Sequence, residues 1–228
     1  MNLLKSLAQI SGMTLLSRVL GFVRDTVIAR GFGAGMETDA FFIAFRIPNL
    51  LRRLFAEGAF SQAFVPVLSE YKNQQGFDAT KDLVDHVASV LALALFVVTL
   101  LGIAIAPLII YVSAPGFSAD PAKFQTTVEL LRITFPYIFF ISLVAFAGGI
   151  LNTHSKFSVP AFTPVLLNLS FIFFALVVAP HLAAPVKALA WAVFAGGLLQ
   201  LAFQIPFLLK LNLLPRWRLN LKDPGVWR

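Results

Sequence analysis

Arginine side chains recur in a strongly apolar part of the chain, and they are its most distinctive chemical groups. Residues 17–57 hold six arginines and four acidic residues, so pairing within this segment leaves guanidinium groups without carboxylates. These charged residues are Arg18, Arg24, Arg30, Arg46, Arg52 and Arg53, with Asp25, Glu37, Asp39 and Glu57. A guanidinium offers forked N–H donors that match phosphate oxygens. The excess of arginine therefore predicts an anionic ligand, in particular a phosphate or pyrophosphate.

These arginines need a polar environment, because an arginine facing lipid at the centre of a membrane helix costs roughly 2.5 to 3.5 kcal/mol. Helical spacing indicates where that environment lies. At 100° per residue, an arc of roughly 120° on the first apolar segment contains Arg18, Gly21, Arg24, Asp25 and Ile28. On the second segment, a slowly drifting stripe at intervals of seven residues contains Asp39, Arg46 and Arg53. We expect each of these two helices to have a polar side that faces an aqueous cavity.

A structural interpretation competes with the ligand cavity. Arg18 or Arg24 could pair with Asp25, and Arg53 could pair with Glu57 four residues later. The arginines could also extend to the lipid headgroups. Internal pairing does not use all of the positive charge, so we favour the cavity.

The helices that carry these residues are predicted from composition. The chain has 58% hydrophobic and 13% charged residues, whereas soluble domains have roughly a quarter charged residues. A helix needs about 20 apolar residues to cross a membrane. Four runs contain no Asp, Glu, Lys, Arg or His, namely 87–119, 133–153, 157–180 and 188–209. With two charge-interrupted segments, 6–30 and 38–66, we predict an all-α polytopic membrane protein with six retained spans.

The positions of lysine and arginine predict the orientation. With a cytoplasmic N-terminus, the inner side receives Lys5, Lys72, Lys81, Lys156, Lys210, Arg216, Arg218, Lys222 and Arg228. The outer side receives only Arg30, Lys123 and Lys187. Because cytoplasmic connections carry the excess of positive charge, we expect both ends of the chain to be cytoplasmic. The net charge of +7 then reflects anchoring to anionic lipid and arginines at membrane depth, so we expect membrane lipids and no nucleic acid as partners.

The remaining polar residues give weaker signals. We expect the stretches 70–86 and 114–123 to be connections, and we expect Asn152, Asn168, Gln200 and Gln204 to act chiefly in interhelical hydrogen bonds. The three histidines lack the spacing of metal ligands, and the chain has no cysteine. No hydrolase, zinc-protease or nucleotide-binding motif occurs, so we expect no enzyme, no catalytic residue, no metal and no cofactor. Several prolines and the pairs Gly148-Gly149 and Gly196-Gly197 favour a bundle that moves.

Three stretches together resemble one known family. They are SRVLGFVRD at 17–25, TDAFFIAFRIPNLLRRLFAEGAFSQAFVPVLSEY at 38–71 and GILNTHSKFSVPAFTPVLLN at 149–168. They closely resemble the N-terminal half of the MurJ (MviN) family of bacterial lipid II flippases, and the resemblance extends over nearly all 228 residues. It implies membership of the multidrug/oligosaccharidyl-lipid/polysaccharide exporter superfamily, whose members have two six-helix lobes around a central cavity. Residues 1–212 would form the N-terminal lobe, and residues 213–228 would begin the cytoplasmic connection to a second lobe.

The resemblance also implies roles for single residues. By similarity, Arg18, Arg24 and Arg52 would line the cavity and contact the pyrophosphate of the substrate. Asp25 and Asp39 would be charged neighbours near the outer end of the cavity. The implied substrate-binding set is completed by Asn49, Arg53, Glu57 and Ser61.

The implied activity is alternating access in the bacterial cytoplasmic membrane, driven by the membrane potential or an ion gradient. The implied substrate is lipid II, the undecaprenyl-pyrophosphate-linked disaccharide pentapeptide, and the cell-wall synthesis machinery is a further implied partner. Two alternatives stay open. An exporter of another polyprenyl-linked oligosaccharide or of drugs would share the fold but should lack the arginine-rich first hairpin. A polyprenyl-phosphate enzyme would need an acid, base or nucleophile cluster at the span ends, which the sequence does not offer.

Overall fold

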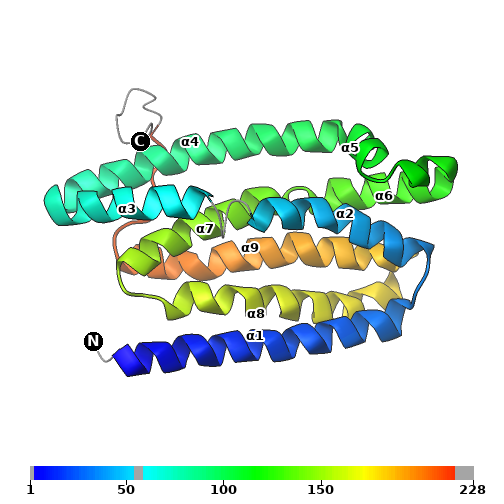
Figure 1. Ribbon diagram of the computed structural model, residues 1–228, viewed down its shortest axis with the longest axis horizontal. Coiled ribbons are helices and arrows are strands. Elements are labelled where there is room, and N and C mark those ends of the chain that lie inside the picture. Colours follow the sequence, from blue (N-terminus) through cyan, green and yellow to red (C-terminus); the bar gives the residue numbers. More distant parts are fainter. Residues whose placement is uncertain (1–2, 54–58, 219–228) are drawn as a thin grey trace.

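Helices that run along one common direction make up the fold (Figure 1). The computed structural model describes residues 3–53 and 59–218, with side chains for 8–53 and 62–218, and no strand occurs in these ranges. The α-helices are α1 (Leu3–Phe32), α2 (Met36–Arg52), α3 (Ala59–Gln74), α4 (Gly76–Ala104), α5 (Ala106–Ser113), α6 (Pro121–Thr134), α7 (Tyr137–Thr153), α8 (Ser158–Phe173) and α9 (Val186–Lys210). Short helical turns cover Pro115–Ala119, Phe174–Val178 and Ala179–His181. The predicted all-α architecture is confirmed.

Four helical segments are long and apolar enough to cross a membrane: Gly76–Ala104, Pro121–Thr153, Ser158–His181 and Val186–Lys210. Each overlaps one of the four charge-free runs, so the helices expected for these four spans are present with the length and apolar composition that crossing requires. Helix α1 has 30 residues, which is enough to cross the hydrocarbon, but charged residues interrupt it. The other charge-interrupted candidate, 38–66, is divided between α2 and α3. The total of six spans therefore stays a prediction.

The helices extend beyond the apolar runs at their polar ends. The stretch 70–86, expected to be a connection, is almost entirely helical, because α3 ends at Gln74 and α4 begins at Gly76. Gly76 has a positive φ of 86°, a backbone conformation that favours glycine in a tight turn. The stretch does connect two helices, as expected, although most of it is itself helical. Polar composition excludes a segment from hydrocarbon, but it does not prevent the segment from being a helix.

Two of the predicted helix breakers do interrupt helices. Helix α4 ends at Ala104 and α5 begins at Ala106, just before Pro107, so the apolar run 87–119 bends instead of continuing as one straight span. Helix α6 ends at Thr134 and α7 begins directly after Pro136. Proline removes a backbone donor and clashes with the preceding turn, which explains both positions.

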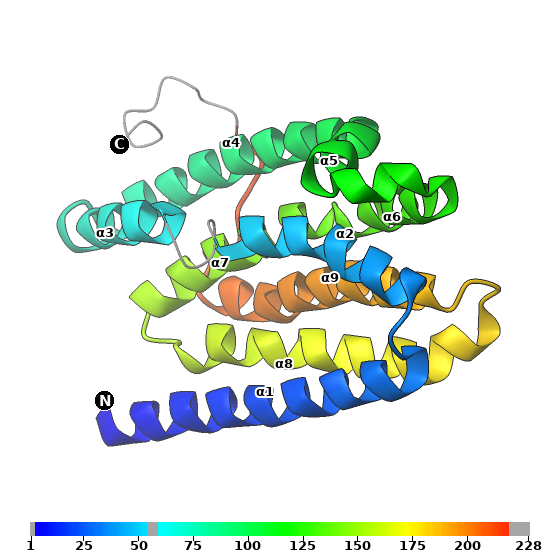
Figure 2. The same ribbon diagram turned by 45° about the vertical axis from the view of Figure 1, so that its right-hand side comes forward.

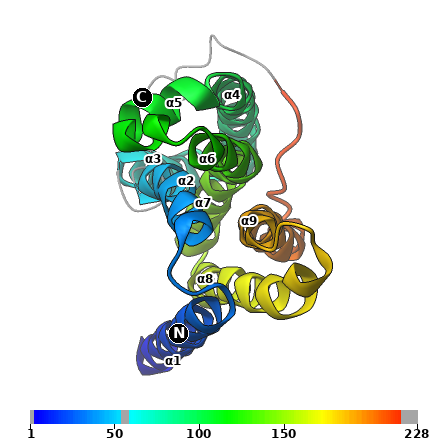
Figure 3. The same ribbon diagram turned by 90° about the vertical axis from the view of Figure 1, so that its right-hand side faces the viewer.

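Helix α9 joins two parts of the bundle, because both α7 and α8 pack on it. Helices α7 and α8 both pack on α9, while α2 packs on α6, and α3 and α4 pack on α7. Figure 2 shows α9 between α8 and α2, and the end view in Figure 3 shows α8 and α7 on different sides of α9. Helix α1 lies along α8 at the edge of the bundle. Its outward side exposes Leu15, Val19 and Phe22, so α1 presents an apolar surface away from α8.

The glycine pair of α9 is a site of close helix packing. Helix α9 continues through Gly196 and Gly197 without a break. A Cβ atom on Gly197 would lie 2.8 Å from Cδ2 of Tyr137, and one on Gly196 would lie 2.6 Å from Cδ1 of Leu167. Both distances are too short for a side chain. These glycines therefore allow α7 and α8 to approach α9 closely.

The connections gather at the two ends of the bundle in the pattern used to predict the orientation. The start of α1, the α3–α4 turn, the α7–α8 connection and the end of α9 lie at one end, and the α1–α2 and α8–α9 connections lie at the other (Figure 1). At the first end, Lys72 Nζ donates to the Thr153 carbonyl at 2.6 Å. At the other end, Lys123 pairs with Asp39 at 3.5 Å and Lys187 pairs with Glu129 at 3.0 Å.

Residues 211–218, here called the strap, fold back from α9 onto α4. Lys81 donates to the carboxylate of Asp85 and, at 2.9 Å, to the carbonyl of Leu214. The backbone N–H of Arg216 donates to Asp85 Oδ1 at 2.8 Å, and the backbone N–H of Arg218 donates to Ser89 Oγ at 2.8 Å. Asp85 is only 1% exposed. A buried carboxylate therefore fastens the strap to the bundle.

Candidate functional site

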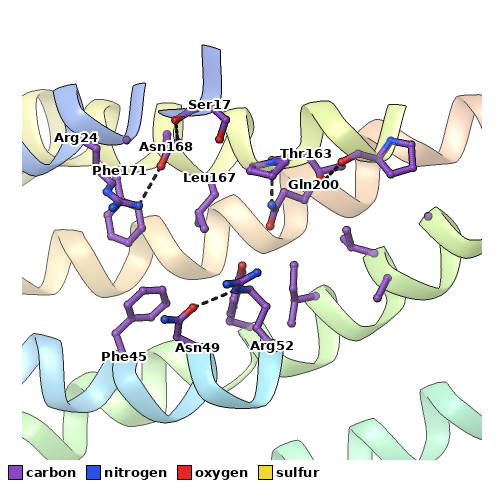
Figure 4. Close-up of a pocket in the computed structure, with 18 of the residues that line it drawn as sticks. Ser17, Arg24, Phe45, Asn49, Arg52, Thr163, Leu167, Asn168, Phe171 and Gln200 are labelled. Atoms are coloured by element: carbon purple, nitrogen blue, oxygen red, sulfur yellow. Dashed lines mark hydrogen bonds between the residues drawn. The ribbon is translucent and has the colours of Figure 1, made fainter. Parts of the chain in front are cut away.

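A cavity of about 620 Å³ opens between α1 and α8 on one side and α2 and α7 on the other, and α9 also borders it. Figure 4 shows side chains from these helices converging on it. Its polar and charged lining consists of Ser17, Arg18, Arg24, Asp25, Asn49, Arg52, Tyr137, Asn152, Thr163, Asn168, Gln200 and Gln204. The remaining lining is aromatic, aliphatic, glycine and proline. Volumes of about 300 to 1,000 Å³ are typical of ligand sites.

Helix α1 presents to this cavity the face that its spacing predicts. All five residues of the predicted arc line the cavity: Arg18, Gly21, Arg24, Asp25 and Ile28. Because α1 is one uninterrupted helix of 30 residues, the periodicity of the sequence translates directly into a face. The side chain of Arg18 is exposed and has no hydrogen-bond or ion-pair partner among the residues that the structure describes.

Arg24 is held by partners on two helices. Its Nε and Nη2 donate to Asp25 Oδ1 at 2.9 and 2.7 Å, and its Nη1 donates to Asn168 Oδ1 on α8 at 3.0 Å. The guanidinium also lies over the ring of Phe171, 5.5 Å from the ring centroid, in a cation–π arrangement. Of the five N–H donors of a guanidinium, these bonds use three, which leaves two for a ligand. The pair between Arg24 and Asp25 that the structural interpretation offered therefore exists, but it does not saturate the arginine.

Asn168 connects α8 to α1 as well as orienting Arg24. Its Nδ2 donates to the carbonyl of Ser17 at 2.9 Å while its Oδ1 accepts from Arg24. Gly21 lies beside it, and a Cβ there would be 3.8 Å from Asn168 Nδ2. The predicted interhelical role of Asn168 is therefore confirmed.

Helix α2 contributes a different face from the one that its charge stripe indicated. Arg52 and Asn49 line the cavity, and Arg52 Nε donates to Asn49 Oδ1 at 3.0 Å. Asp39, Arg46 and Arg53, the members of the stripe, are exposed and do not line it. Asp39 pairs with Lys123 of α6 instead. The stripe and the cavity-lining residues are separated by roughly a quarter turn of the helix, and spacing alone does not say which side faces inward.

The structure thus brings together five of the nine residues that the sequence singled out: Arg18, Arg24, Asp25, Asn49 and Arg52. It leaves Asp39 and Arg53 outside the cavity. Glu57 and Ser61 fall outside the described side chains, and so does the predicted pair between Arg53 and Glu57. Binding of a ligand by any of these residues stays a prediction.

Several lining residues were not predicted as part of a site. Four amides were expected to act chiefly between helices, yet all of them line the cavity: Asn152, Asn168, Gln200 and Gln204. Gln200 does both, since its Nε2 donates to the carbonyl of Thr163 on α8 at 2.9 Å. The available signal was an amide within an apolar helix. That signal does not distinguish a helix contact from a cavity wall.

Aromatic rings from α2 and α8 meet beside Arg24. The ring centroids of Phe45 and Phe171 are 5.9 Å apart in an edge-to-face arrangement, and those of Phe41 and Phe171 are 6.1 Å apart. These contacts connect the two sides of the cavity at one of its ends, where Figure 4 shows Phe45 facing Phe171. They also limit access of water to the Arg24 guanidinium, whose side chain is 28% exposed.

The charge of the cavity suits an anion. Three arginines and one aspartate line it, and no other charged side chain does so among the residues with described positions. Guanidinium groups in a partly desolvated cavity bind phosphate oxygens strongly and with defined geometry. No group of three or more His, Cys, Asp or Glu side chains that could hold a metal occurs in the described ranges.

Comparison with known proteins decides the family. The sequence profile described as Lipid II flippase MurJ matches residues 28–228. The chain belongs to the MurJ family. It is 57% identical to the Lipid II flippase MurJ of Burkholderia cenocepacia over 100% of this chain and 45% of that protein. It is 49% identical to the Probable lipid II flippase MurJ of Vibrio cholerae over 99% of this chain and 44% of that protein.

A solved structure agrees with this assignment. The structure titled Lipid II flippase MurJ, inward closed conformation, superimposes with a TM-score of 0.77 and 31% sequence identity, covering 93% of this chain and 43% of that chain. The chain spans about half the length of the curated MurJ relatives that it matches. Together with its apolar helices, MurJ membership makes this chain a multi-pass inner-membrane protein of a family of transporters, not enzymes.

Proposed function

We propose that this chain forms the N-terminal lobe of a flippase that moves lipid II from the inner to the outer leaflet of the bacterial cytoplasmic membrane. The observation that carries the proposal is the cavity in which Arg18, Arg24 and Arg52 outnumber the single carboxylate of Asp25. The pyrophosphate of lipid II is the part of that molecule that needs such an excess of positive charge. The relatives named lipid II flippases support the same substrate.

The arginines differ in what they offer to a pyrophosphate. Arg24 is fixed by Asp25, Asn168 and Phe171 and keeps two N–H donors, so it presents a preorganised fork. Arg18 is exposed and has no partner among the described residues, which suits a first contact with an incoming anion. Arg52, held by Asn49 on the opposite side of the cavity, provides a second point of attachment. An anion between α1 and α2 would therefore contact both sides of the cavity at once.

Alternating access completes the proposed mechanism. The headgroup enters the cavity from the inner leaflet while the polyprenyl chain stays in lipid, and a movement of this lobe against a second lobe exposes the headgroup outside. Residues 1–212 form the lobe and residues 213–228 begin the connection. The N-terminus is cytoplasmic, the membrane potential or an ion gradient supplies the driving force, and the cell-wall synthesis machinery receives the product.

Genetic complementation tests this proposal. The full-length gene product, with its second lobe, should restore growth when it is expressed in a bacterium depleted of its own lipid II flippase. Arg24→Ala should abolish that rescue at unchanged abundance in the membrane. Arg24→Lys keeps the charge but loses the fork, so it should rescue only partly. Arg30→Ala is the matched control, because Arg30 lies on the same helix but outside the cavity lining. Full rescue by a well-expressed Arg24→Ala variant would refute the role of the cavity.

A further inference from the structure

Polar groups without partners are concentrated where α7 and α9 border the cavity. The hydroxyl of Tyr137, Oε1 of Gln200, and both amide atoms of Gln204 have no hydrogen-bond partner among the described residues. Tyr137 and Gln204 are 0% exposed and Gln200 is 2% exposed. All three residues line the cavity. A buried polar group without a partner is unfavourable, so this arrangement calls for an explanation.

Helical spacing and local contacts bring these three side chains together. Gln200 and Gln204 are four residues apart on α9 and therefore lie on one face of that helix. The Nε2 of Gln200 donates to the Thr163 carbonyl, which fixes the amide plane and leaves Oε1 free to accept. The ring of Tyr137 packs against Gly197, where a Cβ would lie 2.8 Å from Cδ2. Glycine at this position thus allows the tyrosine to lie beside the α9 face that carries both amides.

The unpaired buried side-chain groups elsewhere in the described part of the chain are hydroxyls, not amides. They are the hydroxyls of Thr99 and Ser142, in the apolar helices α4 and α7. A serine or threonine hydroxyl can rotate to a backbone carbonyl one turn earlier in its own helix. The primary amide of Gln204, which has two donor hydrogens and an acceptor oxygen, has no such local solution. The need for an external partner is therefore greatest in the cavity.

We propose that Tyr137, Gln200 and Gln204 form a neutral hydrogen-bonding subsite that binds an uncharged hydroxyl or amide group of the ligand, while the arginines bind its phosphates. A phenol and two primary amides both donate and accept hydrogen bonds, but they cannot neutralise a charge. Their natural complements are sugar hydroxyls, acetamido groups and peptide amides. Because the subsite is shielded from bulk water, a hydrogen bond made there is strong and an unmade one is costly.

This inference rests on the proposed function and deepens it. A cavity that recognised only pyrophosphate would not distinguish a loaded carrier lipid from the empty carrier pyrophosphate. A neutral subsite beside the arginines makes that distinction, because only the loaded lipid offers hydroxyl and amide groups there. Figure 4 shows Gln200 and Thr163 on one side of the cavity and Arg52 on the facing side, so one headgroup can contact both kinds of group.

Equilibrium binding to the purified gene product tests the inference. The protein is placed in nanodiscs of phosphatidylethanolamine and phosphatidylglycerol and titrated with undecaprenyl pyrophosphate, with the same lipid carrying the disaccharide, and with the lipid carrying disaccharide and pentapeptide. The variants are Gln204→Met, which conserves volume, and Tyr137→Phe, which removes only the hydroxyl. Ser142→Ala is the control, because Ser142 is a buried unpaired hydroxyl outside the cavity lining.

We expect each variant to weaken binding of a headgroup-bearing lipid by about three- to tenfold and to leave binding of undecaprenyl pyrophosphate unchanged. A loss already seen with the disaccharide lipid identifies the sugar as the bound part, and a loss seen only with the pentapeptide identifies the peptide. Unchanged affinities for all three lipids, or equal losses for all three, would overturn the subsite. If the parent protein bound none of the lipids, the proposed function itself would fail. Thermal unfolding of the same samples confirms folding, since removing an unpaired polar group should not destabilise the protein.

Discussion

Arg24 on α1 and Asn168 on α8 form a hydrogen bond of 3.0 Å between residues that are 144 positions apart in the sequence. Asn168 also donates to the carbonyl of Ser17, two helical turns before Arg24 on the same helix. This geometry follows from the direction of helical side chains, since Arg24 points back toward the N-terminus of α1 and so reaches the turn that Asn168 contacts. One amide thereby positions the cavity arginine and joins α1 to its main neighbour.

Two substitutions at Asn168 should separate the effect of an added negative charge on transport from the effect of losing the amide hydrogen bonds. Asn168→Asp adds a second carboxylate beside Arg24, which would occupy the donors that a phosphate needs. We expect transport to fall by about tenfold or more, because a charged hydrogen bond contributes roughly 1.5 to 3 kcal/mol. Asn168→Leu removes the hydrogen bonds without adding charge, so its loss should be smaller. A transport assay normalised to membrane abundance checks both variants, and higher activity for the aspartate variant than for the leucine variant would contradict this ranking.

The strap gives a stability prediction centred on Asp85. Asp85→Ala leaves Lys81 without its carboxylate and the N–H of Arg216 without its acceptor. Breaking a buried ion pair by removing one partner costs about 3 to 5 kcal/mol. We therefore expect a lower unfolding temperature and faster tryptic cleavage after Arg216 and Arg218.

A neighbouring residue supplies the matched control for the strap. Asp82 pairs with Arg218 at 2.8 Å, but both side chains are about half exposed, 54% and 52% respectively. An exposed pair contributes about 0 to 1 kcal/mol, so Asp82→Ala should change stability and cleavage very little. Equal effects of the two substitutions would mean that burial of Asp85 is not what holds the strap.

The sequence predicted the fold and the α1 face of the cavity well, because both depend on local periodicity. A helix without breaks converts the spacing of Arg18, Arg24 and Asp25 into one face with little ambiguity. On α2 the same reasoning selected the Asp39, Arg46 and Arg53 stripe, although Asn49 and Arg52 are the residues that line the cavity. The inward side of α2 is decided by its packing on α6, which periodicity does not encode.

The sequence did not predict the neutral subsite of Tyr137, Gln200 and Gln204, for a related reason. Gln200 and Gln204 are isolated amides in an apolar helix, a pattern typical of interhelical hydrogen bonds. Whether they face a neighbour or a cavity depends on which helices surround α9 and how closely they pack. Gly197 and Tyr137 determine that spacing, and their proximity appears only in three dimensions.

His154 predicts a pH dependence of stability. It lies in the α7–α8 connection, where its Nδ1 is 2.9 Å from the Ile150 carbonyl. Burial lowers the pKa of His154 and is the largest effect, the hydrogen bond to the Ile150 carbonyl raises the pKa by less, and the positive charge of Lys72 lowers it by a still smaller amount. Because the folded-state pKa lies below the unfolded value of about 6.5, the unfolded chain binds the proton more readily. Stability should therefore be complete above about pH 6.5 and should decline as the pH falls from there through the folded-state pKa.

The variant His154→Gln checks this sign. Thermal unfolding between about pH 7.5 and pH 5 should show a larger loss for the parent protein than for the variant, since glutamine does not titrate in this range. The comparison cancels contributions from the other titrating groups. Parallel curves for the two proteins would show that His154 does not contribute.

The proposed orientation can be tested with reporter fusions. Because the positively charged connections gather at one end of the bundle, a reporter active only outside the membrane should function when fused after Phe117 or Pro185. The same reporter should be inactive after Gly76 or Lys222. The opposite pattern would require a periplasmic N-terminus. It would also contradict the proposal that the headgroup enters the cavity from the cytoplasmic side.

The central claim is that the cavity arginines bind an anionic lipid-linked headgroup, and two charge-matched triple variants test it most directly. One carries Arg18→Gln, Arg24→Gln and Arg52→Gln, which all line the cavity, and the other carries Arg30→Gln, Arg46→Gln and Arg53→Gln, which do not. Each removes three positive charges from the same hairpin. Binding of lipid II to the gene product in nanodiscs should weaken by at least about a hundredfold for the cavity variant and by less than about threefold for the control. Equal losses for the two variants, or undiminished binding by the cavity variant, would contradict the account.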